Sequence, residues 1–199
     1  MAKRKKTGDS RPGRLRIVAG NWRSRLLDVA DVPGLRPTSQ RIRETLFNWL
    51  SMRIPGARCL DLFAGTGALG LEALSRGARS VVFVERSAQA AAMLRNNIGV
   101  LDAESASVIQ ADAAAWLQGE HGQAFDIAFL DPPFAADLLD DLCRLLEQQD
   151  VLASDALIYL EQDKSKPEPR LPDGWRLLKN KTAGSVRYML AQRQDNQEH

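Results

Sequence analysis

The chain has 199 residues, 44% of them hydrophobic and 26% charged, which is the composition of a single soluble globular domain. Its two cysteines, Cys59 and Cys143, lie far apart inside apolar patterns, which excludes a disulfide framework and favours a reducing, cytoplasmic location. The basic residues 3–6 are not followed by an apolar segment, so the sequence predicts neither a signal peptide nor a membrane span.

The formal net charge of +2 conceals an uneven distribution of charge. Residues 1–53 hold 13 lysines and arginines against 4 acidic residues, whereas the remainder holds 14 against 21. A basic end on an acidic body is expected when one region meets a polyanion and the other performs chemistry. For residues 1–13 alone, which are polar and broken by proline and glycine, a disordered and solvated tail is the simpler interpretation.

Residues 14–53 are expected to form an ordered basic extension. The alternation of apolar and basic side chains from Leu15 to Val29 predicts a β-hairpin that turns at Gly20-Asn21. Thr38 or Ser39 can then cap a helix that runs to about residue 50 with its apolar side chains on one face. The arginines expected on the polyanion-binding surface of this extension are Arg14, Arg16, Arg23, Arg25, Arg36, Arg41 and Arg43.

Residues 54–192 show regular alternation of short apolar strands with helices, and residues 193–199 form a tail. This pattern predicts a Rossmann-like α/β domain with a mostly parallel sheet covered on both faces. The expected strands lie near 58–62, 80–84, 106–110, 125–130 and 156–161, and the expected helices near 68–76, 87–98, 112–118 and 136–148. The two last strands, near 175–180 and 186–191, should form an antiparallel edge hairpin that turns at Ala183-Gly184.

A glycine-rich turn follows the first of these strands, with Gly65, Gly67 and Gly70 in the sequence DLFAGTGALG. Glycines at this spacing let the backbone approach a nucleoside cofactor, but the spacing alone also suits a nicotinamide enzyme. Glu85, just after the second strand, stands where a carboxylate can accept hydrogen bonds from both ribose hydroxyls.

Asp61, which precedes the turn, favours one cofactor over the other. An acid there would repel a pyrophosphate at the helix N-terminus, but it suits the cationic amino group of a methionine moiety. Asp112 can accept from the adenine amine or cap the next helix, and the sequence does not separate these roles. We therefore expect S-adenosylmethionine, bound by Asp61, Phe63, Gly65, Gly67, Glu85, Asp112 and Ala113.

A second motif, Asp131-Pro132-Pro133-Phe134, ends the fourth strand. The exocyclic amine of a nucleic-acid base is a weak nucleophile because its lone pair is delocalised into the ring. The Asp131 carboxylate and the Pro132 carbonyl can accept its two N–H bonds while Phe134 stacks on the base. Alignment then contributes most of the catalysis, without a strong general base. Taken alone, the tetrapeptide could equally be a turn with a core phenylalanine.

With these motifs, the chain resembles the bacterial 16S rRNA guanine-N2 methyltransferases of the RsmD family, which modify guanine 966. The likeness extends from about Arg14 to Gln192. Besides the two motifs, it covers RIVAGNWR at 16–23, LRPT at 35–38, RETLFNWL at 43–50, ALIY at 156–159 and Ala183-Gly184. The N-terminal segments are the more diagnostic ones, because many amino-methyltransferases share the two motifs.

The resemblance implies a seven-stranded class I methyltransferase fold with S-adenosylmethionine as the donor. It also implies that the target is 16S rRNA within an assembling 30S particle, and that the arginines of the extension bind this RNA. The residues themselves predict a base-amine methyltransferase, expected to be a monomer without a metal ion, and leave the base open. An adenine-N6 methyltransferase of DNA or RNA, a non-catalytic assembly factor and a nicotinamide oxidoreductase are the alternatives.

Overall fold

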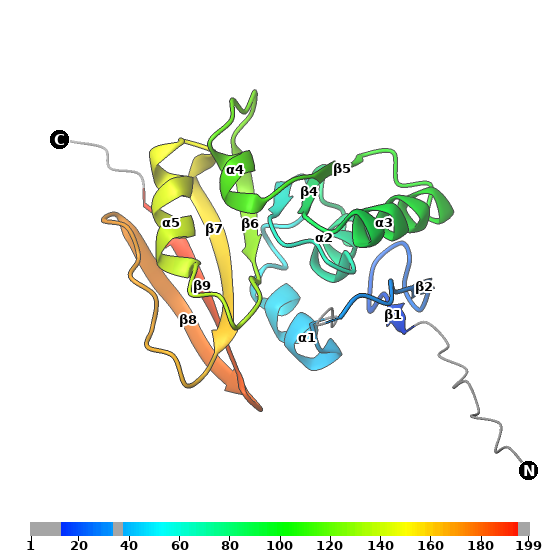
Figure 1. Ribbon diagram of the computed structural model, residues 1–199, viewed down its shortest axis with the longest axis horizontal. Helices are drawn as coiled ribbons and strands as arrows, with labels where there is room; N and C mark the ends of the chain where they lie inside the picture. The colour runs from blue at the N-terminus through cyan, green and yellow to red at the C-terminus, as the bar shows by residue number, and fades with distance from the viewer. Residues whose placement is uncertain (1–12, 34–37, 195–199) are drawn as a thin grey trace, which may run out of the picture.

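The computed structural model describes residues 13–33 and 38–194, which are built around a seven-stranded sheet (Figure 1). The strands of this sheet are β3 (Arg58–Asp61), β4 (Ser80–Glu85), β5 (Ala106–Gln110), β6 (Phe125–Leu130), β7 (Leu152–Asp163), β8 (Trp175–Ala183) and β9 (Val186–Arg193). They lie in the order β5-β4-β3-β6-β7-β9-β8. The five strands β3 to β7 are parallel, and β9 pairs antiparallel with both β7 and β8. The predicted Rossmann-like sheet with an antiparallel edge hairpin is confirmed.

Helices cover both faces of the sheet: α1 (Gln40–Trp49), α2 (Ala68–Ser75), α3 (Ala88–Val100), α4 (Ala113–Leu117) and α5 (Leu139–Gln148). Successive strand residues point to opposite faces. Phe83 and Phe129 therefore pack in one hydrophobic core with α1, α2 and α3, whereas Val84 and Leu130 pack in a second core with α4 and α5. Both faces are buried, which explains why the strands are apolar runs rather than alternating patterns.

The starts of α5 and β7 are among the element boundaries that differ from the sequence prediction. Helix α5 begins at Leu139 rather than near residue 136, because Ala136 is held in a turn after the Asp131 motif. The backbone N–H of Ala136 donates to the Pro133 carbonyl at 2.9 Å, and its own carbonyl accepts from Lys166 Nζ at 3.0 Å. Strand β7 begins at Leu152, before a register shift in its pairing with β6.

The predicted N-terminal hairpin is present as β1 (Arg14–Arg16) and β2 (Leu26–Asp28), which pair antiparallel. Its connection is a long loop, residues 17–25, whose tip docks on the end of α2. The Asn21 N–H donates to the Ser75 carbonyl at 2.7 Å. A Cβ on Gly20 would lie 1.8 Å from the same carbonyl oxygen, and its φ of +80° already favours glycine. Gly20 is thus required by the docking as well as by the turn.

The N-terminal extension shares its core with the sheet. Leu15 and Ile17 of the hairpin and Phe47 of α1 belong to the same hydrophobic cluster as Phe129 of β6. Figure 1 shows the hairpin beside α3, at the opposite side of the molecule from β8. Residues 1–12, 195–199 and the predicted RNA-binding Arg36 lie outside the described residues. No helix in the described parts is long and apolar enough to cross a membrane.

Candidate active site

The glycine turn and the Asp131 motif meet at the carboxyl edge of the sheet. Strand β3 ends at Asp61, and it lies between β4, which ends at Glu85, and β6, which is followed by Asp131. Parallel neighbours place their carboxyl ends together, so residues 70 positions apart in the sequence lie at one edge of the sheet, where ligands of such folds bind. The predicted juxtaposition of the two motifs is confirmed by this topology.

The glycines of the turn serve the close approach of α2 to the sheet. Gly67 has a φ of 77° and forms the N-cap of α2, which has no side-chain cap. A Cβ at Gly67 would lie 2.5 Å from Leu94 Cδ1, and one at Gly70 would lie 2.2 Å from the Phe83 ring. A larger residue at either position would push α2 or α3 away and disrupt the glycine turn.

Asp61 lies beneath the turn and is only 2% exposed. Its Oδ2 accepts from the Gly70 N–H at 3.0 Å and so provides the cap that Gly67 cannot provide. Burial raises the pKa of Asp61 to about 7, against the backbone hydrogen bond from Gly70, and the charges of Asp131 and Glu85 raise it further. With this pKa the Asp61 carboxyl is only partly ionised at neutral pH, and its expected contact with the cofactor's amino group stays a prediction.

Glu85 ties the glycine turn to the end of β4. Its Oε2 accepts from the Gly65 N–H at 2.8 Å and its Oε1 from the Ser87 N–H at 2.6 Å. A carboxylate offers about four acceptor sites, so these two bonds fix its direction and leave capacity for ribose hydroxyls. Phe63, within the turn, is partly buried against the second core.

Asp112 caps α4, which confirms one of its two predicted roles. Its Oδ1 accepts from the N–H groups of Ala114 and Ala115 at 3.0 and 3.2 Å. Its side chain is exposed, and Ala113 beside it is buried. The adenine contact remains a prediction for the exposed carboxylate.

The Asp131 motif presents one acid and one aromatic ring. Burial raises the pKa of Asp131 to about 6, and a hydrogen bond from Thr38 Oγ1 to Oδ2, at 3.1 Å, lowers it. Phe134 is partly exposed and belongs to neither hydrophobic core, so the interpretation of this residue as a core phenylalanine is not supported. Pro132 is buried and Pro133 is exposed.

A second acid, absent from the sequence prediction, lies beside Asp131. Glu161 on β7 is 4% exposed and accepts from Tyr159 Oη at 2.5 Å. Burial, reinforced by the charge of Asp131, raises the pKa of Glu161 to about 8. Four carboxyl groups, those of Asp61, Glu85, Asp131 and Glu161, thus lie near this edge of the sheet. The only sequence signal was an acid closing an apolar strand.

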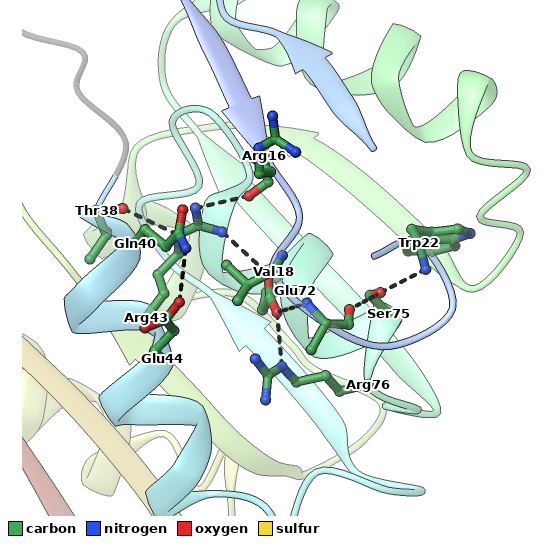
Figure 2. Close-up of polar contacts among 12 residues, drawn as sticks. Arg16, Val18, Trp22, Thr38, Gln40, Arg43, Glu44, Glu72, Ser75 and Arg76 are labelled. Carbon is green, nitrogen blue, oxygen red and sulfur yellow. Dashed lines mark hydrogen bonds and ion pairs between the residues drawn. The ribbon is translucent and has the colours of Figure 1, made fainter. Parts of the chain in front are cut away.

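The expectation that Arg43 lies on the polyanion-binding surface of the extension is wrong. Its side chain is buried, and Nη1 lies 3.2 Å from Glu72 Oε2 on α2 (Figure 2). Arg43 directly follows Ile42 and stands three residues before Leu46, so its stem borders the apolar stripe of the helix. A buried acid on α2 draws the guanidinium inward. The other predicted RNA-binding arginines in the described parts are exposed: Arg14, Arg16, Arg23, Arg25 and Arg41.

Comparison with known proteins identifies the family of this chain. The family described as conserved hypothetical protein 95 matches residues 15–192. Ribosomal RNA small subunit methyltransferase D of Escherichia coli (strain K12) is 46% identical over 190 residues, 96% of each chain. The protein of the same name from Haemophilus influenzae is 46% identical over 90% of this chain and 94% of that protein. The chain belongs to this methyltransferase family.

The solved structures agree with the fold. The structure of yhhF from Escherichia coli has a TM-score of 0.86 and 43% identity, covering 92% of this chain and 100% of that chain. The class I methyltransferase fold predicted from the sequence is thus confirmed, and S-adenosylmethionine is the cofactor of the enzyme. SMU.776, solved in complex with SAH, shares the fold alone, with 16% identity and a TM-score of 0.68 over 93% of this chain and 57% of that chain. The glycine turn fits such a nucleoside, because Glu85 beside it keeps acceptor capacity for ribose hydroxyls after its two backbone bonds.

Proposed function

We propose that this methyltransferase acts on the exocyclic N2 amine of a guanine in 16S rRNA, at guanine 966 by its family resemblance. The observation that carries the proposal is the position of Asp131. It lies beside the glycine turn, at the carboxyl ends of neighbouring strands. The names of the relatives from Escherichia coli and Haemophilus influenzae support small-subunit ribosomal RNA as the substrate.

The Asp131 motif holds the target amine in this proposal. The Asp131 carboxylate and the Pro132 carbonyl accept its two N–H bonds, and the partly exposed Phe134 stacks on the purine. Two acceptors at a fixed separation favour the pyramidal nitrogen that attack requires, so orientation is the main contribution of the protein. With a pKa of about 6, Asp131 is mostly ionised at neutral pH and can take up the proton that the methylated amine releases.

The residues around the glycine turn would hold the cofactor. Glu85 is directed at the turn by its two backbone bonds and would accept from the ribose hydroxyls. Asp112 would accept from the adenine amine with its exposed carboxylate, and Asp61 would act at the amino group or through the turn that it caps. When bound, S-adenosylmethionine supplies an activated methyl group on a cationic sulfur.

The exposed arginines of the hairpin and of α1 would contact phosphates rather than bases. Within the described residues, the part outside the catalytic sheet is a short hairpin and one helix, which suits contact with phosphates better than reading of base edges in a groove. Phosphate contacts position an RNA, and enzymes that modify a base take it out of its stack. We therefore propose that the arginines orient a splayed nucleotide of an assembling 30S particle. Arg36, outside the described residues, remains part of this prediction.

The test is transfer of tritium from labelled S-adenosylmethionine to small-subunit particles that lack their own modification, followed by nucleoside analysis. Label in N2-methylguanosine is the expected result, and free 16S rRNA assayed in parallel separates the particle from naked RNA as the substrate. Label in N6-methyladenosine would move the target to adenine. Absence of label, with S-adenosylmethionine bound normally, would favour a non-catalytic assembly role.

A further inference from the structure

Two adjacent hydroxyl residues before α1 have different roles. Ser39 is the N-cap, and its Oγ accepts from the Ile42 N–H at 3.3 Å. Thr38 is 8% exposed, and its Oγ1 donates instead to Asp131 Oδ2 at 3.1 Å, across 93 positions of the sequence. Because Ser39 already caps the helix N-terminus, the Thr38 hydroxyl can bond to Asp131, the acid proposed to hold the target base.

The backbone of Thr38 is itself held by a buried arginine. Arg43 Nε donates to the Thr38 carbonyl at 3.2 Å, and Nη2 donates to the Arg16 carbonyl at 2.9 Å. The third nitrogen, Nη1, pairs with Glu72 at 3.2 Å, and both members of this ion pair are almost completely buried. Figure 2 shows Arg43 between Thr38, Arg16 and Glu72. A planar guanidinium that is engaged in three directions fixes the position of each partner.

Glu72 extends the same network into the N-terminal hairpin. Its two carboxylate oxygens accept from the backbone N–H groups of Val18 and Ala19, at 2.9 and 3.0 Å. Oε1 also accepts from Arg76 Nε at 2.8 Å (Figure 2). The loop that carries the proposed RNA-binding Arg23 is therefore joined to Asp131 by consecutive hydrogen bonds through Glu72, Arg43 and Thr38.

We propose that Thr38 is a positioning residue for methyl transfer, whose hydroxyl directs the Asp131 carboxylate toward the target amine. Arg43 and Glu72 fix Thr38 to the hairpin. The distance between the proposed RNA-binding surface of the hairpin and Asp131 is therefore kept constant. The inference rests on the proposed function of Asp131. Within the described residues, Thr38 is the one hydrogen-bond partner of this carboxylate, so Oδ1 is left to accept from the amine.

The effect of Thr38 on Asp131 can be measured through the pKa of the Asp131 carboxyl. The titratable groups that interact electrostatically with Asp131 are Asp61 on β3 and Glu161 and Tyr159 on β7. The group that favours the charged form of Asp131 is the hydroxyl of Thr38, before α1. Loss of the hydroxyl should therefore raise the pKa of Asp131 and move the acid limb of the activity profile to higher pH. A role of Thr38 in folding alone would leave that limb in place.

The experiment compares three variants with the wild type. Thr38→Val removes the hydroxyl at nearly constant shape, Thr38→Ser keeps it, and Ser39→Ala removes only the helix cap. With small-subunit particles, we expect Thr38→Val to lower kcat about 10- to 100-fold with KM nearly unchanged. Its acid limb should shift upward by roughly half to one pH unit. Thr38→Ser should keep most of the activity, and Ser39→Ala should lower the melting temperature without changing the pH profile.

An unchanged kcat and pH profile for Thr38→Val would overturn the proposal, as would equal losses for Thr38→Ser and Thr38→Val. If Thr38→Val does not fold, Thr38→Ala replaces it under the same criteria. NMR titration of the Asp131 carboxyl in the free protein separates this inference from the proposed function. If the wild type methylates no particle, the proposed function fails, and the titration still decides the role of Thr38: a raised pKa of Asp131 in the variant supports it, and an unchanged one refutes it.

Discussion

The cofactor side of the site, around the glycine turn, and the base side, around Asp131, are held in place in different ways. On the cofactor side, each acid bonds to nearby backbone: Glu85 to Gly65 and Ser87, and Asp112 to the first turn of α4. On the base side, Asp131 depends on Thr38, which depends in turn on a buried ion pair between two helices. The cofactor side is therefore secured by neighbouring strand-turn-helix units of the sheet itself, whereas the base side requires the N-terminal extension to be docked.

This difference predicts that changes on the base side can abolish transfer while cofactor binding persists. Asp131→Ala removes the acid that accepts from the target amine, and we expect kcat to fall by about 1,000-fold or more. The glycine turn makes no hydrogen bond to Asp131 in the described structure, so the Kd for S-adenosylmethionine should change little. Calorimetry measures the Kd and tritium transfer measures kcat. Near wild-type turnover would refute the proposed role of Asp131 in holding the target base.

The buried pair between Arg43 and Glu72 should dominate the stability of the docked extension. Arg43→Met leaves Glu72 charged and buried beside only Arg76 and backbone donors, which should cost about 3–5 kcal/mol of unfolding free energy. Arg41→Met, two residues earlier on the same helix and exposed, is the matched control and should change stability by less than about 0.5 kcal/mol. Urea denaturation measures both, and equal effects would show that the pair does not hold the extension.

The raised pKa of Asp131 predicts a conflict between stability and function. Its folded-state pKa of about 6 exceeds the ordinary value of 3.8, so the folded state is favoured by protonation. The corresponding stability is fully present below pH 3.8 and is lost as the pH rises through 6. Asp131→Asn, which cannot ionise, should therefore stabilise the protein by about 2 kcal/mol at pH 8 and by much less at pH 4.5. Chemical denaturation at both pH values tests this, and destabilisation at pH 8 would contradict it.

The same contrast explains which features the sequence predicted. The strands, the glycine turn and the capping role of Asp112 depend on residues close together in the chain, where periodicity and cap rules apply. Thr38 was predicted as one of two possible helix caps and Arg43 as an RNA-binding residue, because their partners, Asp131 and Glu72, are distant in sequence. No local pattern identifies such partners. Glu161 was missed for a related reason, since only the packing of β7 beside the end of β6 shows that it is buried.

The smallest expected effect concerns the exposed arginines of the hairpin. Replacing Arg23 and Arg25 together by glutamine removes two proposed phosphate contacts. The salt dependence of RNA binding should therefore flatten by about 0.7 per contact in the slope of log K against log salt concentration. Arg79→Gln, at the amino-terminal end of β4 and exposed, is the control and should leave the slope unchanged. Filter binding over a range of salt concentrations measures both.

An unchanged slope for the hairpin variant would place the RNA on another surface. A flatter slope with unchanged kcat would show that the arginines bind RNA without setting the geometry at Asp131.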